Sequence, residues 1–167
     1  MLIDLSIPSV IALNIAAWLV IQIGLAWVMI RLPLGWFTGR NPCARPRSWE
    51  SRGRIYERLF NIKKWKDRLP DASRMFRGGF AKAQLKSAST DYLRCFMAET
   101  WRGELTHWLA LLALPVFCVW NPWWGVVINA VVAIALNIPC VLAQRYNRVR
   151  FSRVIAKKSG VGIQSPS

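Results

Sequence analysis

Two long stretches of this chain, Leu5 to Ile30 and Leu105 to Gln144, contain no Lys, Arg, Asp or Glu. A helix needs about 20 apolar residues to cross the hydrocarbon core of a bilayer, and the two stretches supply roughly three such lengths. The 167-residue chain is 54% hydrophobic, yet it carries a net charge of +15. This separation of apolar and basic residues excludes an ordinary soluble globule and predicts an all-α integral membrane protein.

We expect a single membrane domain with about three transmembrane helices, at residues 8–30, 104–120 and 125–143. The first apolar run is too long for a secretory signal, and no Lys or Arg precedes it, so we expect it to remain as a permanent helix. Asn121-Pro122 divides the second run and predicts the turn of a helical hairpin.

Aromatic and proline residues add detail to the predicted hairpin. Tryptophans favour the membrane interface because their rings are amphipathic, and three of them crowd the expected turn: Trp120, Trp123 and Trp124. Pro115 and Pro139 fall within the two hairpin helices. Neighbouring helices can satisfy the backbone groups that a proline frees, so we expect kinks rather than breaks there.

The basic residues set the expected orientation. All 23 Lys and Arg side chains lie between Arg31 and Arg102 or between Arg145 and Lys158. Cytoplasmic segments of membrane proteins are enriched in Lys and Arg. We therefore expect residues 32–100 and the tail at residues 145–167 to be cytoplasmic, with the N-terminus and the Trp-rich turn outside. The predicted location is the cell (inner) membrane, in a multi-pass arrangement.

The middle segment contains a basic amphipathic pattern. Ile55, Leu59, Ile62, Lys66 and Leu69 follow helical spacing, with further Lys and Arg between them. Such a helix suits the surface of a bilayer with anionic lipids. The alternative is a solvated helix that packs on its neighbours.

Residues that typically end helices, form loops or begin helices divide the rest of this segment. Pro70-Asp71 is expected to end the amphipathic helix, Gly78-Gly79 indicates a loop, and Thr90-Asp91 indicates the start of a long helix.

Several functional classes lack the residues they need. Most tryptophans lie in or beside the apolar runs rather than among the basic residues, which argues against nucleic-acid binding. The four cysteines form no CxxC pair, and there is one histidine, so neither a metal site nor a disulfide framework is indicated. No Gly-rich phosphate loop or GxSxG motif is present. We expect no bound cofactor, and group transfer is favoured over redox chemistry.

The candidate catalytic residues lie at the start of the second apolar run. Glu104 and His107 share a helix face at i, i+3 spacing, and Thr100 lies on that face one turn earlier. A carboxylate that orients an imidazole is a usual construction of a general base. Ionisable side chains in a spanning helix are costly and mark candidate functional sites. The alternative is that both side chains only extend toward lipid headgroups.

A second polar cluster lies near the cytoplasmic end of the third predicted helix. His107 and Asn137 each lie about 15 residues from Pro122, which is about 22 Å along a helix, so they are expected at one level. The residues after Asn137 could bind the phosphates of a lipid or an activated donor, because Arg binds phosphate in a bidentate manner. These residues are Gln144, Arg145, Asn147, Arg148 and Arg150. The alternative is that topology alone places Arg after a spanning helix.

At these motifs the chain resembles the glycosyl-4,4'-diaponeurosporenoate acyltransferase family. The first blocks that carry the resemblance contain Arg31, Pro33, Phe37, Trp49, Glu50, Gly53, Asn61, Lys64, Trp65, Lys66 and Asp71. The most specific blocks contain Glu99, Thr100, Arg102, Glu104, His107, Trp108, Asn137, Pro139, Gln144, Arg145, Asn147, Arg148 and Arg150. The resemblance spans most of the chain and implies a membrane O-acyltransferase that acts on a glycolipid, a glycosylated carotenoid or a similar molecule.

Combined with the resemblance, the residues suggest a mechanism. His107 is expected to deprotonate a sugar hydroxyl, Glu104 to stabilise the imidazolium, and the alkoxide to attack an acyl thioester. Asn137, with Asn147 or Arg145, is the expected oxyanion donor. Acyl-CoA or an acyl carrier protein is the expected donor substrate. The residues expected to bind the donor or the acceptor are Arg145, Asn147, Arg148, Arg150, Gln144, Lys64, Lys66, Arg102 and Thr100.

Two alternatives from other classes remain at this point. The chain could be a non-catalytic basic membrane adaptor that binds anionic lipid or an acidic partner. It could also be a transferase that acts on a different lipid, such as a hopanoid or a glycerol glycolipid.

Overall fold

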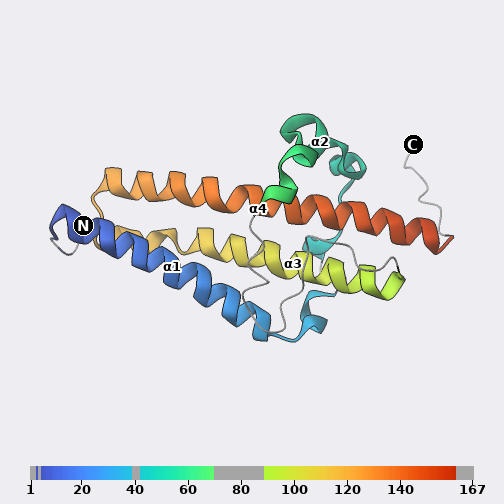
Figure 1. The fold of residues 1–167 in the computed structure, drawn as a ribbon, viewed down its shortest axis with the longest axis horizontal. Helices are drawn as coiled ribbons and strands as arrows, with labels where there is room; N and C mark the ends of the chain where they lie inside the picture. The colour runs from blue at the N-terminus through green and yellow to red at the C-terminus, as the bar shows by residue number, and fades with distance from the viewer. Residues whose placement is uncertain (1–2, 4, 39–41, 70–88, 161–167) are drawn as a thin grey trace.

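The computed structural model describes residues 3, 5–38, 42–69 and 89–160, and every regular element in these residues is helical (Figure 1). The predicted all-α class is therefore confirmed for the described part of the chain. The α-helices are α1 (Ile7–Arg31), α2 (Arg54–Phe60), α3 (Thr90–Leu112) and α4 (Trp123–Lys158). Short 3-10 helices connect them: η1 (Leu34–Phe37), η2 (Pro42–Ala44), η3 (Ser48–Gly53), η4 (Ile62–Lys64), η5 (Lys66–Arg68) and η7 (Leu114–Val119).

Among the described helices, α1 and α4 are long and apolar enough to cross a membrane. The ends of α1 follow from local sequence, because Pro8 suits the first turn of a helix and Pro33 holds Leu32 in an extended conformation. Many large apolar side chains of α1 are exposed, as expected for a surface that faces lipid. The bounds of α1 match the first predicted span within a residue.

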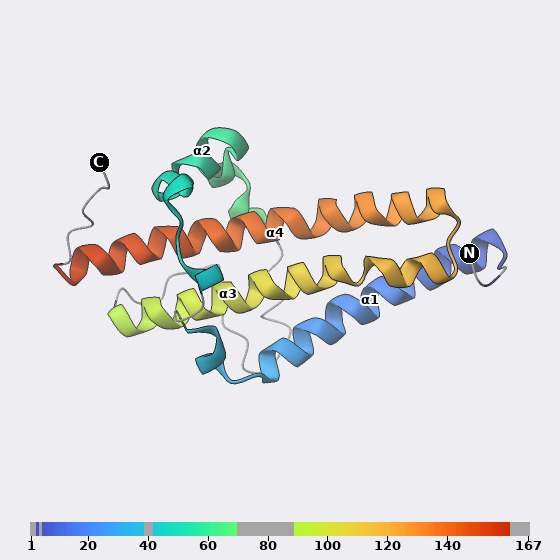
Figure 2. The same cartoon turned by 180° about the vertical axis from the view of Figure 1, so that it is seen from behind.

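The predicted hairpin is formed by α3 and α4, which run antiparallel in both views (Figure 2). The hydroxyl of Ser89 accepts a hydrogen bond from the backbone N–H of Tyr92 and caps α3 where the sequence predicts a helix start. The kink predicted at Pro115 is wrong, because α3 ends at Leu112 and the chain continues as η7. Proline lacks the N–H that would continue the α-helix and clashes with the preceding turn.

The third predicted span is part of a longer helix. Pro139 lies inside α4, and the helix continues through it to Lys158. Residues 145–158, predicted as the beginning of a tail, therefore extend α4. This extension carries the polar residues of the second cluster on a rigid element.

The amphipathic helix predicted from Ile55 onward is much shorter in the structure. α2 ends at Phe60 because Asn61 adopts a left-handed conformation with φ 49°. Ile62 is fully buried in a cluster with Tyr56 and Tyr146 of α4, so this segment packs on its neighbours as the alternative interpretation expected. The expected helix end at Pro70-Asp71 and the loop at Gly78-Gly79 lie outside the described residues.

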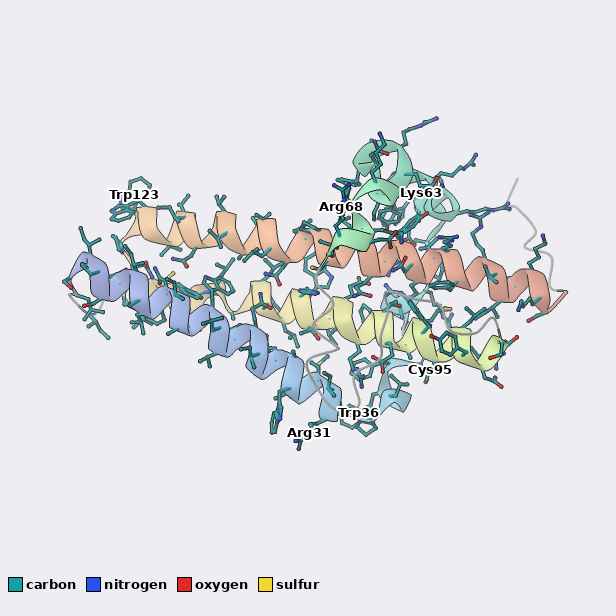
Figure 3. The ribbon with its side chains drawn as sticks, viewed as in Figure 1. Arg31, Trp36, Lys63, Arg68, Cys95 and Trp123 are labelled. Atoms are coloured by element: carbon teal, nitrogen blue, oxygen red, sulfur yellow. The ribbon has the colours of Figure 1, made fainter. Side chains whose placement is uncertain are left out.

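Apolar and basic surfaces separate along the long axis of the molecule. Trp123 lies at one end, whereas Arg31, Lys63 and Arg68 lie well away from it (Figure 3). The Trp123 side chain is 80% exposed. This separation is what the charge pattern of the sequence predicts.

Candidate active site

Three asparagines on α4 and just before it face the other helices at intervals of eight residues. The amide NH₂ groups of Asn121, Asn129 and Asn137 donate to the backbone carbonyls four residues earlier, at 3.0, 2.9 and 2.9 Å. Their Oδ1 atoms therefore remain as acceptors toward neighbouring side chains. Gly125 makes room between the first two of these, because a Cβ there would lie 2.9 Å from Asn121 Oδ1.

The helix α1 supplies partners for these three acceptors. Asn14 and Asn121 form two reciprocal amide hydrogen bonds of 2.9 and 2.8 Å. Trp18 Nε1 donates to Asn129 at 2.9 Å, and Gln22 Nε2 donates to Asn137 at 3.1 Å. We call these three contacts the amide rungs.

The uncharged run from Leu5 to Ile30 predicts a spanning helix, but its two amide-bearing residues Asn14 and Gln22 were assigned no role, so the rungs were missed. The signal that could have found them is their spacing, since residues 14, 18 and 22 are four residues apart and share one helix face.

The last rung also contacts the single histidine of the chain. His107 Nδ1 lies 2.9 Å from Asn137 Oδ1, so the two side chains meet at one level as their distances from Pro122 predict. The amide NH₂ of Asn137 is occupied by the Ala133 carbonyl, so Oδ1 is the acceptor and Nδ1 the donor. With the proton on Nδ1, the lone pair of a neutral imidazole lies on Nε2. The side chain of His107 is half-buried.

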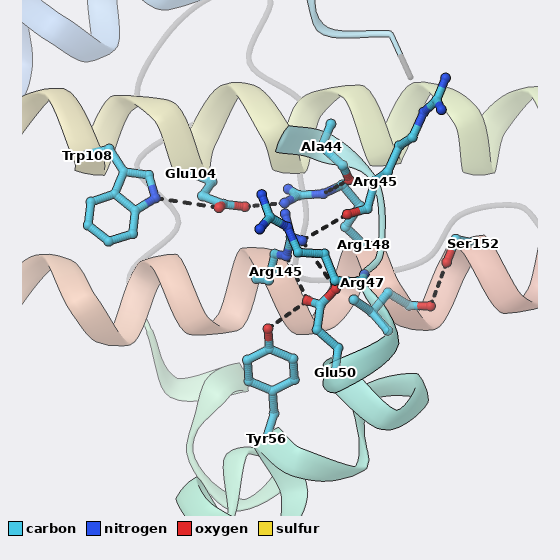
Figure 4. Close-up of polar contacts among 11 residues, drawn as sticks. Ala44, Arg45, Arg47, Glu50, Tyr56, Glu104, Trp108, Arg145, Arg148 and Ser152 are labelled. Carbon is cyan, nitrogen blue, oxygen red and sulfur yellow. Dashed lines mark hydrogen bonds and ion pairs between the residues drawn. The ribbon is translucent and has the colours of Figure 1, made fainter. Parts of the chain in front are cut away.

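Glu104 pairs with Arg148 across the hairpin (Figure 4). Both side chains are buried, and Glu104 also accepts a 3.5 Å hydrogen bond from Trp108 Nε1. Arg148 Nε donates to the Ala44 carbonyl at 2.8 Å, and its guanidinium lies 5.2 Å from the ring centroid of Trp101. These contacts hold α3, α4 and η2 together.

A second buried ion pair joins Arg145 to Glu50 in a bidentate arrangement, with contacts of 2.7 and 3.1 Å (Figure 4). The Tyr56 hydroxyl donates to the same carboxylate at 2.7 Å, and so does the backbone N–H of Arg47. Glu50 is fully buried. Arg145 also donates to the Arg45 carbonyl at 2.8 Å. The guanidinium predicted to bind phosphate is thus satisfied by a carboxylate and a carbonyl.

Electrostatics at Glu50 follow from these contacts. Burial raises the pKa of Glu50, but the hydrogen bonds from Arg145, Arg47 and Tyr56 together lower it below its ordinary value of 4.5. Burial and the neighbouring Glu50 carboxylate raise the pKa of Tyr56. The pair is therefore ionised, and the phenol is neutral, at physiological pH.

A tight turn brings Glu50 to this position. Ser51, Arg52 and Gly53 all have left-handed backbone conformations, with φ 46°, 59° and 89°. A Cβ at Gly53 would lie 3.5 Å from the Tyr146 ring. Glycine supplies both the backbone freedom and the close approach of η3 to α4. Sequence reasoning quoted Glu50 and Gly53 within a motif but assigned them no role.

Two further predicted binding residues have structural partners on α3 and near it. Arg102 donates to Glu99 at 2.6 Å and to the Ile30 carbonyl at 3.5 Å, and it lies over the Phe37 ring. Thr100 is fully buried and donates to the Met97 carbonyl at 2.7 Å.

The remaining residues predicted to bind substrate differ in how exposed their side chains are. Lys64 and Arg150 are exposed, Lys66 pairs with Asp67, and Asn147 is half-buried. Two buried atoms have no hydrogen-bond partner among the described residues: Gln144 Oε1 and Arg148 Nη1. They are an acceptor and a donor separated by one helical turn on α4. In the described part of the chain, no three His, Cys, Asp or Glu side chains gather as a metal site would require.

Comparison with known proteins decides the family. A sequence model of glycosyl-4,4'-diaponeurosporenoate acyltransferase matches residues 33–157. The chain belongs to this acyltransferase family. The Staphylococcus haemolyticus glycosyl-4,4'-diaponeurosporenoate acyltransferase is 32% identical over 135 residues, which cover 81% of this chain and 78% of the relative. The enzyme of the same name from Staphylococcus aureus strain Newman is 28% identical over 145 residues, covering 86% and 87%.

The family match bears on the site in two ways. It includes His107, Asn137 and the buried pairs Glu50–Arg145, Glu104–Arg148 and Glu99–Arg102, because all of them lie between residues 33 and 157. It begins after α1, so the helix that supplies the amide rungs precedes the matched region. No solved structure matches this chain.

Proposed function

We propose that this acyltransferase esterifies a sugar hydroxyl of a glycosylated carotenoid with a fatty acyl group from an acyl thioester, either acyl-CoA or an acyl carrier protein. The names of its relatives support the acceptor. The observation that carries the proposal is the 2.9 Å contact of His107 Nδ1 with Asn137 Oδ1, which leaves the basic lone pair on Nε2. An imidazole held in one tautomer is suited to general-base catalysis.

In the proposed reaction, His107 Nε2 removes the proton of the sugar hydroxyl. The oxygen forms a bond to the thioester carbonyl carbon, and the resulting tetrahedral intermediate collapses with cleavage of the C–S bond. The imidazolium returns its proton to the departing thiolate, so the enzyme ends in its initial state. Glu104 stabilises the imidazolium, and its contacts with Arg148 and Trp108 hold its carboxylate in place.

The polar atoms of α4 suggest how the substrates are held. Asn137 donates to Ala133 and Arg145 to Glu50, and Asn147 lies ten residues beyond Asn137 on α4, about 15 Å along the helix. We therefore assign the oxyanion to Arg148 Nη1, whose guanidinium pairs with Glu104, three residues from His107 on α3. We assign Gln144 Oε1, a buried acceptor on the same helix without a partner among the described residues, to a hydroxyl of the acceptor sugar. The exposed cations Lys64 and Arg150, with Lys66, suit the phosphates of coenzyme A or an acidic carrier protein. Arg102 and Thr100 support α3 rather than contact substrate.

The proposed topology has three spans in the cell membrane: α1, the apolar half of α3 with η7, and the apolar part of α4. The N-terminus and the turn at Trp123 lie outside, and the basic segments lie on the cytoplasmic side among anionic lipids. His107 then lies near the level where acyl chains meet the cytoplasmic headgroups. A glycolipid and an acyl thioester can meet there.

The test is product formation by the purified protein in lipid nanodiscs. Four acceptors are supplied with acyl-CoA in separate reactions: a glycosylated carotenoid, its aglycone, a glycosylated hopanoid and a glycosyl diacylglycerol. Mass spectrometry should detect a new ester only with the glycosylated carotenoid. Ester formation with another glycolipid alone would refute the proposed acceptor, and no ester with any acceptor or with an acyl carrier protein donor would refute the proposed reaction.

A further inference from the structure

Gln22 contacts the proposed base through one intervening side chain. Its Nε2 donates to Asn137 Oδ1 at 3.1 Å, and the same oxygen accepts from His107 Nδ1 at 2.9 Å. An amide oxygen has two lone pairs, so it accommodates both donors. Helix α1 is therefore connected to the imidazole by a continuous pair of hydrogen bonds.

The orientation of the Asn137 amide is determined from three sides. Its NH₂ donates to the Ala133 carbonyl at 2.9 Å, and the two donors lie at its oxygen. If the amide rotated by half a turn, its oxygen would face the Ala133 carbonyl and its NH₂ would face the Gln22 NH₂. A rotated amide would also present a donor to His107 Nδ1, and the imidazole would then need its proton on Nε2. The acceptor–acceptor contact with Ala133 and the donor–donor contact with Gln22 would cost more free energy where water is scarce.

We propose that Gln22 is a positioning residue of the active site, which maintains the Asn137 amide in the orientation that keeps the His107 proton on Nδ1. This inference rests on the proposed role of His107 as the base. It assigns to α1, which precedes the region matched by the family, a part in the chemistry beyond anchoring. The other two rungs also join α1 to α4, but they do not contact the imidazole.

The single histidine makes the tautomer directly measurable. Protein labelled with ¹⁵N-histidine in nanodiscs gives one pair of imidazole nitrogen signals, which identify the protonated nitrogen. The wild type should show predominantly Nδ1–H at a pH where the ring is neutral. Gln22→Leu should convert a substantial fraction to Nε2–H. Its kcat should fall about three- to tenfold, the equivalent of one hydrogen bond, with KM little changed.

Trp18→Phe is the matched control. It removes an indole N–H that donates to Asn129, one turn earlier on the same face of α1, and leaves the imidazole contact intact. The control should retain the wild-type nitrogen signals and kcat. In an Asn137→Leu background, Gln22→Leu should cause no further loss of kcat, because the amide through which it acts is absent.

Wild-type nitrogen signals in Gln22→Leu would overturn the inference, and so would an equal change of the signals in Trp18→Phe. The nitrogen signals need no substrate, so they separate this inference from the proposed reaction. A tautomer shift in a protein without acyl transfer would refute the reaction alone. An unchanged tautomer in an active enzyme would refute the role of Gln22 alone.

Discussion

The two halves of the helical bundle bury polar side chains by different means. Toward the Trp123 end, the buried contacts are neutral and consist of the amide rungs between α1 and α4. Toward the C-terminus of α4, they are ionic and consist of the Glu50–Arg145, Glu104–Arg148 and Glu99–Arg102 pairs. We call these regions the amide half and the ionic half.

The difference reflects the cost of desolvation. Neutral amides lose less free energy than ions when they leave water, so they are the polar groups that a bilayer-spanning region tolerates. Ions require paired partners and proximity to headgroups and water. The last rung of the amide half, Gln22–Asn137, contacts His107, which lies three residues from Glu104 on α3. The proposed base thus lies where the two means of burial meet.

The largest expected effect comes from breaking an ion pair of the ionic half. Glu50→Leu leaves the buried Arg145 without its carboxylate partner, which should cost about 3–5 kcal/mol of unfolding free energy. Denaturation of the purified protein in detergent measures this loss. Lys63→Met is the control, because it breaks the exposed Lys63–Glu57 pair, keeps the hydrogen bond from Tyr146 to Glu57, and should change stability far less. Equal losses of unfolding free energy in the two variants would show that burying the ion pair does not increase the cost of breaking it.

A smaller loss is expected from acid. The pKa of Glu50 in the folded protein lies below its ordinary value of 4.5, so folding favours the ionised form. Its contribution to stability is complete above that value and is lost as pH falls from it through the lower pKa of the folded state. The melting temperature should therefore decline below about pH 4.5 in the wild type. In Glu50→Gln this part of the decline should be absent, and a parallel decline would assign it to other groups.

The smallest expected effect comes from the amide half. Trp18→Phe removes one neutral hydrogen bond and should cost about 0.6 kcal/mol, the average for such bonds between membrane helices. Denaturation under the conditions used for Glu50→Leu gives the comparison. A cost as large as that of the ion pair would remove the distinction between the two halves.

The amide half was accessible to sequence reasoning in outline. Uncharged runs predict α1 and the hairpin, and counting residues from Pro122 places His107 level with Asn137. The rungs themselves were missed because Asn14 and Gln22 are uncharged residues within an apolar run, and Trp18 is typical of such a run. Their partners become visible only when the relative rotation of α1 and α4 is known.

The ionic half could not be predicted in the same way. Arg145 and Glu50 are 95 residues apart, and their contact depends on three successive left-handed residues ending at Gly53. A guanidinium binds carboxylate and phosphate through the same geometry, so Arg145 and Arg148 resemble phosphate-binding residues in the sequence. The end of α2 at Asn61 was also missed, because helical spacing continues through it.

The central claim is that the His107 imidazole is the general base of acyl transfer. The most direct measurement is kcat for ester formation by wild type and His107→Ala in nanodiscs, with saturating glycosylated carotenoid and acyl-CoA and with matching melting temperatures. Loss of a positioned general base should lower kcat by about 10²- to 10⁴-fold. An equal kcat in the two proteins would contradict the account.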